Sequence, residues 1–431
     1  MSVSIALERR VADDRPILFG LFGAGFMGRG ILNQNKHLKG VRCAAVCNRS
    51  VEKAVATVED LGLGPTVVVS SGEELDLVIE SGKIPVTSDP QVLCESALLD
   101  CVVEATGNVD YGATVVSLAL DHSKHTVLMN AELDATVGPL LARKAREAGL
   151  VYTGCGGDQP AVQMDLYRFV QSMGLRPLVC GNIKGLQDRY RNPETQKSFA
   201  RQWGQTPSMV TSFADGTKIS FEQAIVANAT GMKVATRGMT GIEHEGHVDD
   251  LVDLYDLEEL RRLGGVVDYV IGPRPSPGVY VLAEARDQIQ AHYLKYGKLG
   301  DGPLYSFYVP YHLTVLEVAN TVVRVVEYGE EVIAPQARPV VDVITAAKRA
   351  LRSGEIIDGL GGYMTYGLCE NHPITASQKL LPMGLAEGCA LKRDIDRDEV
   401  IGVEDVEFPE GTMIHRLRAE QDDLFADTVS R

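Results

Sequence analysis

Residues 17–28 read Ile-Leu-Phe-Gly-Leu-Phe-Gly-Ala-Gly-Phe-Met-Gly, an apolar run that passes directly into the pattern Gly23-x-Gly25-x-x-Gly28. A strand, this spacing and then a helix are typical of a dinucleotide-binding turn. Gly23 permits the tight turn, Gly25 lets the backbone approach a pyrophosphate, and Gly28 lets the helix pack on the strand, so that the helix N-terminus faces the anion. The stretch predicts a dinucleotide-binding site at Gly23, Ala24, Gly25, Phe26, Met27 and Gly28.

A polar turn follows the second predicted strand, Val41–Cys47, and reads Asn48-Arg49-Ser50. Pockets for NAD usually carry Asp or Glu roughly 20 residues after the glycine pattern, where it accepts hydrogen bonds from the ribose. Here Arg49 is suited to pair with a 2′-phosphate, to which Asn48 and Ser50 can donate. The turn therefore favours NADP over NAD. The alternative is an ordinary turn in which Ser50 caps a helix at Val51–Leu61.

Composition places the chain among globular enzymes. Its 431 residues exceed what one core usually supports, so two or three domains are expected. A net charge of −16 argues against nucleic acid and anionic membranes as partners. Eight cysteines without a Cys-x-x-Cys pattern, together with a start that lacks an apolar signal core, indicate a reduced, cytoplasmic protein.

Alternating strands and helices up to residue 152 predict a Rossmann-type parallel sheet, that is, an α/β domain. The expected strands include Asp100–Glu104, His125–Met129 and Leu150–Thr153, and the expected helices include Tyr111–Leu120 and Ala135–Ala148. Ligands of such sheets bind at the carboxyl ends of the strands. Thr106, Gly107 and Asn130 lie at two such ends, where they are expected to contact the coenzyme or to form plain turns.

Residues 153–333 predict an α+β substrate domain with a mostly antiparallel sheet, through which subunits pair into a homodimer or homotetramer. Helices are expected at Gln159–Met173, Ile219–Gly231 and Leu313–Val326, the last returning to the nucleotide domain; strands are expected at Leu178–Lys184, Val266–Ile271, Val279–Ala283 and Leu304–Val309. Residues 334–431 follow two prolines and predict a small β-rich domain, which includes a strand at Val340–Ile344.

Several of these stretches together resemble the homoserine dehydrogenase family. They are Gly23–Gly28, Ala105-Thr-Gly-Asn, the turn at Asn130 and the helix–strand arrangement up to Gly185. The last segment resembles the β-clip modules called SAF domains. The layout and the stretch Asp215-Gly-Thr-Lys-Ile-Ser-Phe-Glu222 resemble the reductoisomerase-like branch, which implies NADPH-dependent conversion of 1-deoxy-D-xylulose 5-phosphate to 2-C-methyl-D-erythritol 4-phosphate, a step of isoprenoid biosynthesis.

The chain departs from the homoserine dehydrogenase pattern at its lysines. The family's Asn-Lys is Asn130-Ala131 here, and its second lysine falls on Val226. Its Asn-Gly-Thr asparagine falls on Lys184, and the glutamate after its sixth strand falls on Gly154. A reductase without those lysines needs another group to polarise the substrate oxygen, so activity on homoserine is not expected.

Three side chains of the middle domain are the candidate catalytic groups. Lys184 ends a predicted strand, and a desolvated lysine can act as oxyanion partner and acid. Asp188 and Glu222 are candidate acid–base groups, and with Asp158 they are candidate ligands for Mg²⁺ or Mn²⁺. Basic residues that follow are expected to hold a substrate phosphate, with Arg189, Arg191 and Lys218 as the candidates. Solvated surface charges are the plain alternative for each.

The sequence therefore predicts an NADP(H)-dependent oxidoreductase that reduces or rearranges a small, phosphorylated keto-sugar. One alternative is a homoserine- or sugar-acid-type NAD(P) dehydrogenase. Another, of a different class, is a protein that binds nucleotide or carbohydrate without turnover, for which the missing family lysines speak.

Overall fold

The computed structural model describes residues 2–426 and divides the chain into two compact units. Unit 1 comprises Met1–Asp158 and Leu313–Ala334, and unit 2 comprises Gln159–His312 and Pro335–Arg431. The predicted return of the helix near Leu313–Val326 to the nucleotide domain is confirmed. The division differs from the three predicted domains, since the segment predicted as a separate domain from residue 334 shares a unit with the middle segment.

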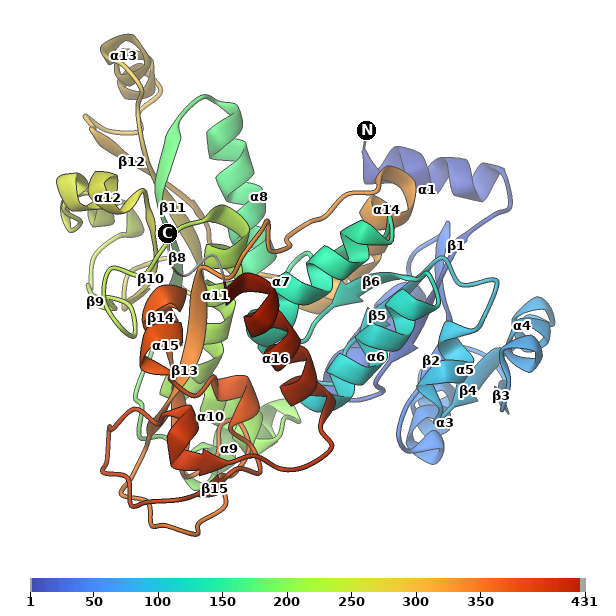
Figure 1. Ribbon diagram of the computed structural model, residues 1–431. Coiled ribbons are helices and arrows are strands. Elements are labelled where there is room, and N and C mark those ends of the chain that lie inside the picture. The colour runs from blue at the N-terminus through green and yellow to red at the C-terminus, as the bar shows by residue number, and fades with distance from the viewer. Residues whose placement is uncertain (1, 427–431) are drawn as a thin grey trace. The chain divides into compact units, whose positions relative to one another are not determined.

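Unit 1 is built on a seven-stranded sheet (Figure 1). Its strands are β1 (Ile17–Phe22), β2 (Val41–Cys47), β3 (Thr66–Val68), β4 (Ile84–Thr87), β5 (Cys101–Glu104), β6 (His125–Leu128) and β7 (Tyr152–Gly154). They pair in the order β3-β4-β2-β1-β5-β6-β7, and every pairing is parallel. The predicted α/β fold is confirmed. Because β1 lies between β2 and β5, the turns that follow these three strands are neighbours at one edge.

Helices cover both faces of this sheet. They are α1 (Val3–Ala12), α2 (Phe26–Asn35), α3 (Val51–Asp60), α4 (Gly72–Glu80), α5 (Pro90–Cys94), α6 (Val109–Asp121), α7 (Ala131–Glu147), the 3₁₀ turn η2 (Thr314–Leu316) and α14 (Val318–Tyr328). One apolar cluster joins α1, α2, α3 and α14 to the sheet, and a second joins α4, α5 and α6 to it. In α14, Val322 and Val323 are fully buried in the first cluster, which explains why this distant segment belongs to unit 1.

Unit 2 contains a mixed five-stranded sheet of order β12-β11-β8-β10-β9. Its strands are β8 (Arg176–Lys184), β9 (Ile242–Glu243), β10 (Val266–Ile271), β11 (Gly278–Glu284) and β12 (Leu304–Val309). As predicted, β11 pairs antiparallel with β8 and β12. By contrast, β10 pairs parallel with β8 and β9, because the long, partly helical connection from β8 to β10 provides a crossover.

The helices of this part are α8 (Gln159–Ser172), α9 (Pro193–Trp203), α10 (Pro207–Asp215), α11 (Thr217–Thr230), α12 (Leu257–Leu263), α13 (Gln288–Tyr296) and the 3₁₀ turn η1 (Val248–Asp253). Helix α11 is buried on every side, whereas α13 has no buried residue. A helix that is buried all round lies inside a core rather than on its surface. The polar side chains at the buried positions of α11, such as Glu222, are therefore desolvated.

The last segment contains two small antiparallel sheets, as predicted, together with two helices. It contains β13 (Val341–Ala347), β14 (Thr365–Asn371), α15 (His372–Gln378), η3 (Met383–Leu385), β15 (Ala390–Leu391), η4 (Val403–Asp405), β16 (Val406–Glu407) and α16 (Met413–Phe425). β13 pairs antiparallel with β14, and β15 with β16. The Thr217 hydroxyl accepts a 3.0 Å bond from the Gly367 N–H, and the Ser220 hydroxyl donates to the Gly367 carbonyl at 3.0 Å. These bonds attach α11 to β14, which is why the segment does not form a separate unit.

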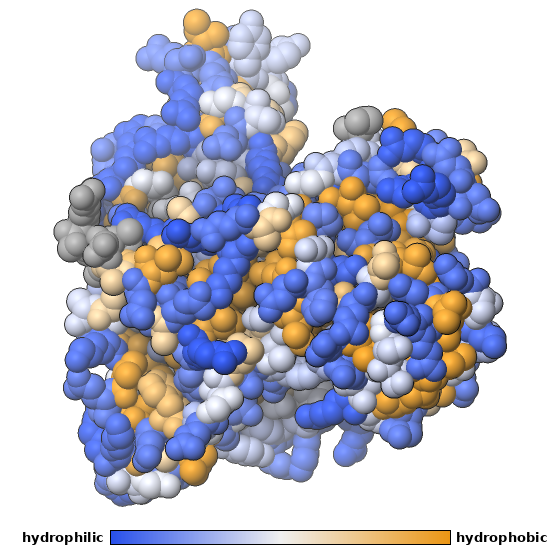
Figure 2. Space-filling view, turned by 45° about the vertical axis from the view of Figure 1, so that its right-hand side comes forward, coloured by the Kyte–Doolittle hydropathy of each residue, from blue (hydrophilic) through white to orange (hydrophobic). Residues whose placement is uncertain are grey.

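All eight cysteines are buried and none forms a disulfide, as the prediction of reduced core residues requires. Burial raises the pKa of Cys43 and of Cys47 to about 12, so both thiols stay protonated. Within residues 2–426 no helix is long and apolar enough to cross a membrane. Hydrophilic residues predominate on the face shown in Figure 2, with apolar patches between them.

Candidate functional site

The glycine turn of unit 1 has the geometry that its spacing predicts. Gly23 has a φ of +99°, and a Cβ atom there would lie 2.7 Å from the Ala105 carbonyl oxygen. A Cβ atom on Gly28 would lie 1.9 Å from the Gly23 carbonyl oxygen. A Cβ atom on Gly25, in contrast, would meet no atom within 4 Å. Gly23 and Gly28 are thus required by packing, whereas the space beside Gly25 is free for a ligand.

The turn after β2 supports the glycine turn directly. The Asn48 side-chain oxygen accepts a 3.0 Å hydrogen bond from the Ala24 N–H, and its amide nitrogen donates to the Ser50 carbonyl at 2.7 Å. The Ser50 hydroxyl caps α3 by accepting from the Lys53 N–H at 3.3 Å, and it donates to the Glu52 carboxylate at 3.0 Å. Both side chains therefore hold the turn, which is the alternative role that the sequence left open for Ser50.

Arg49 differs from its two neighbours. Its side chain is exposed, and within residues 2–426 its guanidinium has no hydrogen bond or ion pair. Among Asn48, Arg49 and Ser50, the side chain of Arg49 is therefore the one that is charged and not already bonded within the described residues. Contact of Asn48, Arg49 and Ser50 with a 2′-phosphate stays a prediction.

The turns after β5 and β6 are held by a buried carboxylate and an amide. The Thr106 N–H donates to Glu104 at 2.8 Å, and the Thr106 hydroxyl also bonds this carboxylate. Gly107 is exposed with a φ of +68°. Asn130 is 1% exposed; its oxygen caps α7 at the Leu133 N–H (3.1 Å) and its nitrogen donates to the Asn108 carbonyl at 3.1 Å. Asn130 thus positions the β5 turn, and direct contact of these residues with a coenzyme remains a prediction.

Two buried acids lie beneath this edge. Burial raises the pKa of Glu104, at the end of β5, although its bonds from Thr106 oppose the shift. Burial also raises the pKa of Asp134 to about 7, although the Tyr152 hydroxyl donates to it at 2.9 Å and opposes the shift. Asp134 lies in the first turns of α7, which begins at Ala131 rather than at the predicted Ala135. Polar residues occupy buried positions there, so the apolar pattern misses the start of the helix.

In unit 2 the candidate catalytic residues Lys184 and Glu222 are close enough to interact. The Lys184 amine, at the end of β8, donates to the Phe213 carbonyl at 2.7 Å. Burial lowers the pKa of Lys184, and the negative charges of Glu222 and Asp215 oppose that shift. The lysine therefore lies close enough to Glu222 and Asp215 for their charges to act on it, and its net pKa is lowered. It can donate a proton to an oxygen atom more readily than a solvated lysine can.

Glu222 is fixed by a network of amides that the sequence analysis did not identify. The Asn182 amide nitrogen donates to the Glu222 carboxylate at 3.0 Å and to the Gln159 oxygen at 3.1 Å. The Gln163 amide donates to the Asn182 oxygen at 2.6 Å, and the Gln223 amide donates to Gln163 at 3.3 Å. Asn182 and Gln163 are fully buried. The signal was an asparagine inside an apolar strand, which needs buried hydrogen-bond partners.

A second lysine lies in the same core and also went unidentified. Lys348 is 6% exposed, and its amine donates to Asp215 at 2.9 Å and to the Arg191 and Gly362 carbonyls at 2.8 Å each. Burial raises the pKa of Asp215, and the charge of Lys348 opposes that shift. No local pattern marks Lys348, because its partners come from three other segments of the chain.

The remaining predicted residues of unit 2 are less favourably placed. Asp188 forms an ion pair with Arg191 at 3.0 Å and accepts from the Tyr190 N–H at 3.1 Å, so its two oxygens are already bonded. The Arg189 guanidinium lies 5.6 Å from the centre of the Tyr366 ring and 3.5 Å from its hydroxyl. Lys218 is half-buried near the start of α11. The Asp188–Arg191 pair weakens the predicted roles of both as metal ligand and phosphate anchor.

The predicted metal site does not fit the residues present. Within residues 2–426 no group of three or more His, Cys, Asp or Glu side chains could hold an ion. Asp158 belongs to unit 1, whereas Asp188 and Glu222 belong to unit 2. The Glu222 oxygen that bonds Asn182 and both oxygens of Asp188 already have partners. The predicted Mg²⁺ or Mn²⁺ is therefore not supported, and no step of the chemistry is assigned to it.

Comparison with protein families gives a match in the middle segment. Residues 157–318 match the family described as "Oxidoreductase DRL, catalytic domain". This segment nearly coincides with Gln159–His312, the part of unit 2 that contains Lys184 and Glu222. No curated protein matched the chain. The chain thus combines a Rossmann-type sheet with a middle segment similar to the catalytic domain of that oxidoreductase family.

Several solved dehydrogenases are similar to the chain at low identity. A probable dehydrogenase from Thermotoga maritima is 13% identical with a TM-score of 0.41, and the match covers 73% of this chain and 90% of that one. A scyllo-inositol dehydrogenase from Lactobacillus casei with bound NAD(H) is 10% identical with a TM-score of 0.42, over 74% and 91% of the two chains. A 3-ketoreductase from Actinomadura kijaniata in complex with NADP is 15% identical with a TM-score of 0.37, over 74% and 91%.

Proposed function

We propose that the protein is an NADP(H)-dependent dehydrogenase of a small hydroxy or keto compound of the sugar or sugar-acid type. The proposal rests on the presence of two features in one chain. One is a glycine turn with space for a pyrophosphate, and the other is Lys184, which lies near Glu222 in unit 2. The turn residues 23–28 and Arg49 are the residues that hold the coenzyme. When bound, NADP(H) supplies or accepts the hydride.

Lys184 supplies the proton in this proposal. Its ammonium donates to the substrate oxygen as negative charge develops there, while the Phe213 carbonyl fixes the direction of the side chain. Glu222 keeps the lysine charged until transfer, and Asn182 holds Glu222 in place. In the oxidative direction the same amine accepts the hydroxyl proton.

Lys184→Met tests this role. We expect kcat to fall by about 10²- to 10⁴-fold, the usual contribution of a positioned acid–base group, with NADPH affinity unchanged within about twofold. Lys197→Met is the matched control, because Lys197 is exposed and paired with Glu194 at 2.7 Å. Turnover is followed through the absorbance of reduced nicotinamide, with sugar acids and polyols as substrates. Equal turnover in both variants would remove Lys184 from the mechanism.

Reductoisomerisation of 1-deoxy-D-xylulose 5-phosphate to 2-C-methyl-D-erythritol 4-phosphate is the second candidate. It is favoured by the stretch Asp215–Glu222, which brings two carboxylates beside Lys184, and by the cation Arg189, five residues after Lys184 in the sequence. It also needs a group that handles two adjacent hydroxyls, for which the described residues offer no metal cluster. NADPH consumption with this phosphate, and none with unphosphorylated polyols or sugar acids, would favour it over plain dehydrogenation.

The binding-only alternative and the oligomeric state are tested alongside. NADPH binding without turnover of any substrate, and unaffected by Lys184→Met, would favour a protein that binds without catalysis. The match to an oxidoreductase catalytic domain supports catalysis instead. We also propose a homodimer or homotetramer, which sedimentation velocity of the purified chain measures; a single monomeric species would contradict it.

A further inference from the structure

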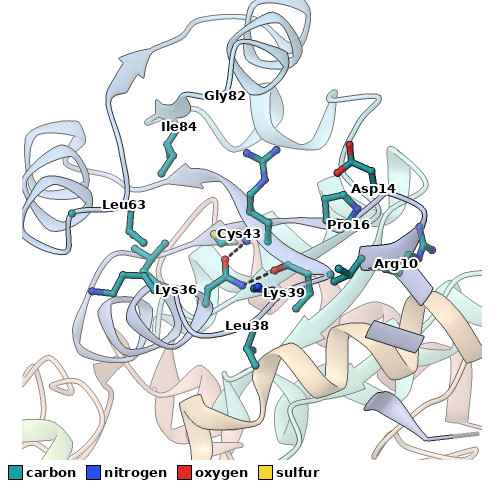
Figure 3. Close-up of a pocket in the computed structure, with 17 residues that line it drawn as sticks. Arg10, Asp14, Pro16, Lys36, Leu38, Lys39, Cys43, Leu63, Gly82 and Ile84 are labelled. Atoms are coloured by element: carbon teal, nitrogen blue, oxygen red, sulfur yellow. Dashed lines mark hydrogen bonds between the residues drawn. The ribbon is translucent and has the colours of Figure 1, made fainter. Parts of the chain in front are cut away.

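Figure 3 shows a cavity of unit 1 with a volume of about 600 Å³. It lies at the end of the seven-stranded sheet opposite the glycine turn. It is lined by residues at or just before the starts of β1, β2 and β4, among them Pro16, Val41 and Ile84. The glycine turn follows the other end of β1, which has six residues. At about 3.3 Å per residue, the cavity lies roughly 20 Å from that turn. The cavity is therefore separate from the edge of the sheet that carries the glycine turn.

Basic residues outnumber acidic ones in the lining of this cavity, although the protein as a whole carries a net charge of −16. Arg10, Lys36, Lys39 and Arg42 line it, and Asp14 is the one acid among its lining residues. Arg10 is paired with Glu327, and Lys36 donates to the Leu61 carbonyl at 3.0 Å. These two bases are already engaged by the protein.

Arg42 and Lys39 are not engaged in this way. Among residues 2–426, neither side chain has an ion pair, and the Arg42 Nε atom is buried without a hydrogen-bond partner. Buried guanidinium nitrogens are ordinarily bonded, because losing water without gaining an acceptor is unfavourable. A guanidinium also presents paired donors that match the oxygens of a phosphate or a carboxylate. The cavity therefore lacks an acceptor that an anion would supply.

Other residues that line the cavity are apolar, and hydrogen bonds hold the backbone of β2 beside them. Leu38, Leu63 and Ile84 line the cavity beside the basic residues, as Figure 3 shows. The Asn35 side chain accepts from the Cys43 N–H at 2.6 Å and donates to the Val41 carbonyl at 3.2 Å, which holds the start of β2. A preformed pocket with apolar walls and a few convergent polar groups is the usual form of a small-molecule site.

We propose that this cavity binds a small organic anion with an apolar portion, its phosphate or carboxylate held by Arg42 and Lys39. The apolar portion packs on Leu38, Leu63 and Ile84. This site lies outside the coenzyme turn and outside unit 2, so it does not depend on the proposed dehydrogenase activity.

Calorimetric titration of the full chain, saturated with NADPH to occupy the coenzyme site, tests the proposal. The probes are phenyl phosphate, benzoate and inorganic phosphate. We expect phenyl phosphate or benzoate to bind at least tenfold more tightly than inorganic phosphate, because only these two reach the apolar wall. Whichever of the two binds more tightly identifies the anionic group.

Arg42→Gln should weaken that binding at least tenfold, whereas Lys83→Gln should leave it unchanged. Lys83 is exposed, lies beside Gly82 and Ile84 in sequence, and does not line the cavity. The variant Arg189→Gln, in unit 2, should also leave binding unchanged. Unfolding curves and NADPH affinity equal to wild type establish that Arg42→Gln is folded. If no probe binds, or if Arg42→Gln binds as wild type does, the proposal is overturned; Lys39→Gln applies the same test should Arg42→Gln not fold.

Discussion

Two regions of the molecule differ in how the chain assembles them. The coenzyme edge of unit 1 consists of the turns after β1, β2, β5 and β6, and the polar core of unit 2 contains Lys184, Glu222 and Lys348. At the coenzyme edge, one continuous stretch, Gly23–Gly28, forms the glycine turn. A neighbouring turn contacts it through a hydrogen bond from the Ala24 N–H to the Asn48 side chain. In unit 2, Lys184, Glu222 and Lys348 come from three separate segments and depend on buried hydrogen bonds. We therefore expect the turn residues of unit 1 to tolerate substitution better than the buried polar residues of unit 2, where removal of one partner leaves another unpaired.

The largest expected effect tests the interdependence of the unit 2 core. Lys348→Met leaves Asp215 buried without its cation and the Arg191 and Gly362 carbonyls without a donor. Removing one member of a buried ion pair costs about 3–5 kcal/mol, and we expect that loss in the free energy of unfolding measured with urea.

The matched control is the double variant Lys348→Met with Asp215→Asn, which should recover part of the loss because no unpaired charge remains. A loss below about 1 kcal/mol for Lys348→Met would mean that the ion pair does not hold these segments together.

A smaller effect is expected beneath the coenzyme edge, from Asp134. Burial raises the pKa of Asp134 from the ordinary 3.8 to about 7, so the folded protein binds this proton more tightly than the unfolded chain does. Its contribution to stability is therefore complete below about pH 4 and is lost as the pH rises towards about 7. The slope is at most about 1.4 kcal/mol per pH unit.

Asp134→Asn removes this titration and keeps an acceptor for the Tyr152 hydroxyl. The variant should be more stable than wild type at about pH 8, by up to a few kcal/mol, with a flatter pH dependence between about pH 4 and 7 in urea unfolding. Asp13→Asn, at an exposed position, should leave the slope unchanged. An unaltered slope in Asp134→Asn would show that this carboxyl is ionised in the folded protein.

The smallest expected effect is a change in coenzyme affinity when Arg49, in the turn after β2, is replaced. Arg49→Asp places a carboxylate where we expect the 2′-phosphate, so NADPH affinity should fall more than about tenfold, which is about 1.4 kcal/mol, while NADH affinity changes little. Lys53→Asp makes the same change of charge at an exposed position in α3 and should have a smaller effect. Equal losses for both coenzymes in Arg49→Asp would mean that the turn does not discriminate between them.

The sequence predicted the features that depend on one continuous stretch and missed those that depend on contacts between distant segments. The strand–turn–helix at residues 17–35, the parallel sheet and the strands Val266–Ile271 and Leu304–Val309 follow from local apolar patterns. The parallel pairing of β10, the attachment of β14 to α11 and the role of Lys348 depend on contacts between distant segments, which a local pattern does not encode. Lys184 and Glu222 were predicted through a family resemblance, and the bond from Asn182 that orients Glu222 was missed.

Calorimetric titration of the wild-type chain with NADPH and with NADH measures whether a nicotinamide coenzyme binds at the glycine turn with its 2′-phosphate beside Arg49. We predict one NADPH bound per chain, at least tenfold more tightly than NADH. Absence of binding for both coenzymes, or tighter binding of NADH, would contradict the account.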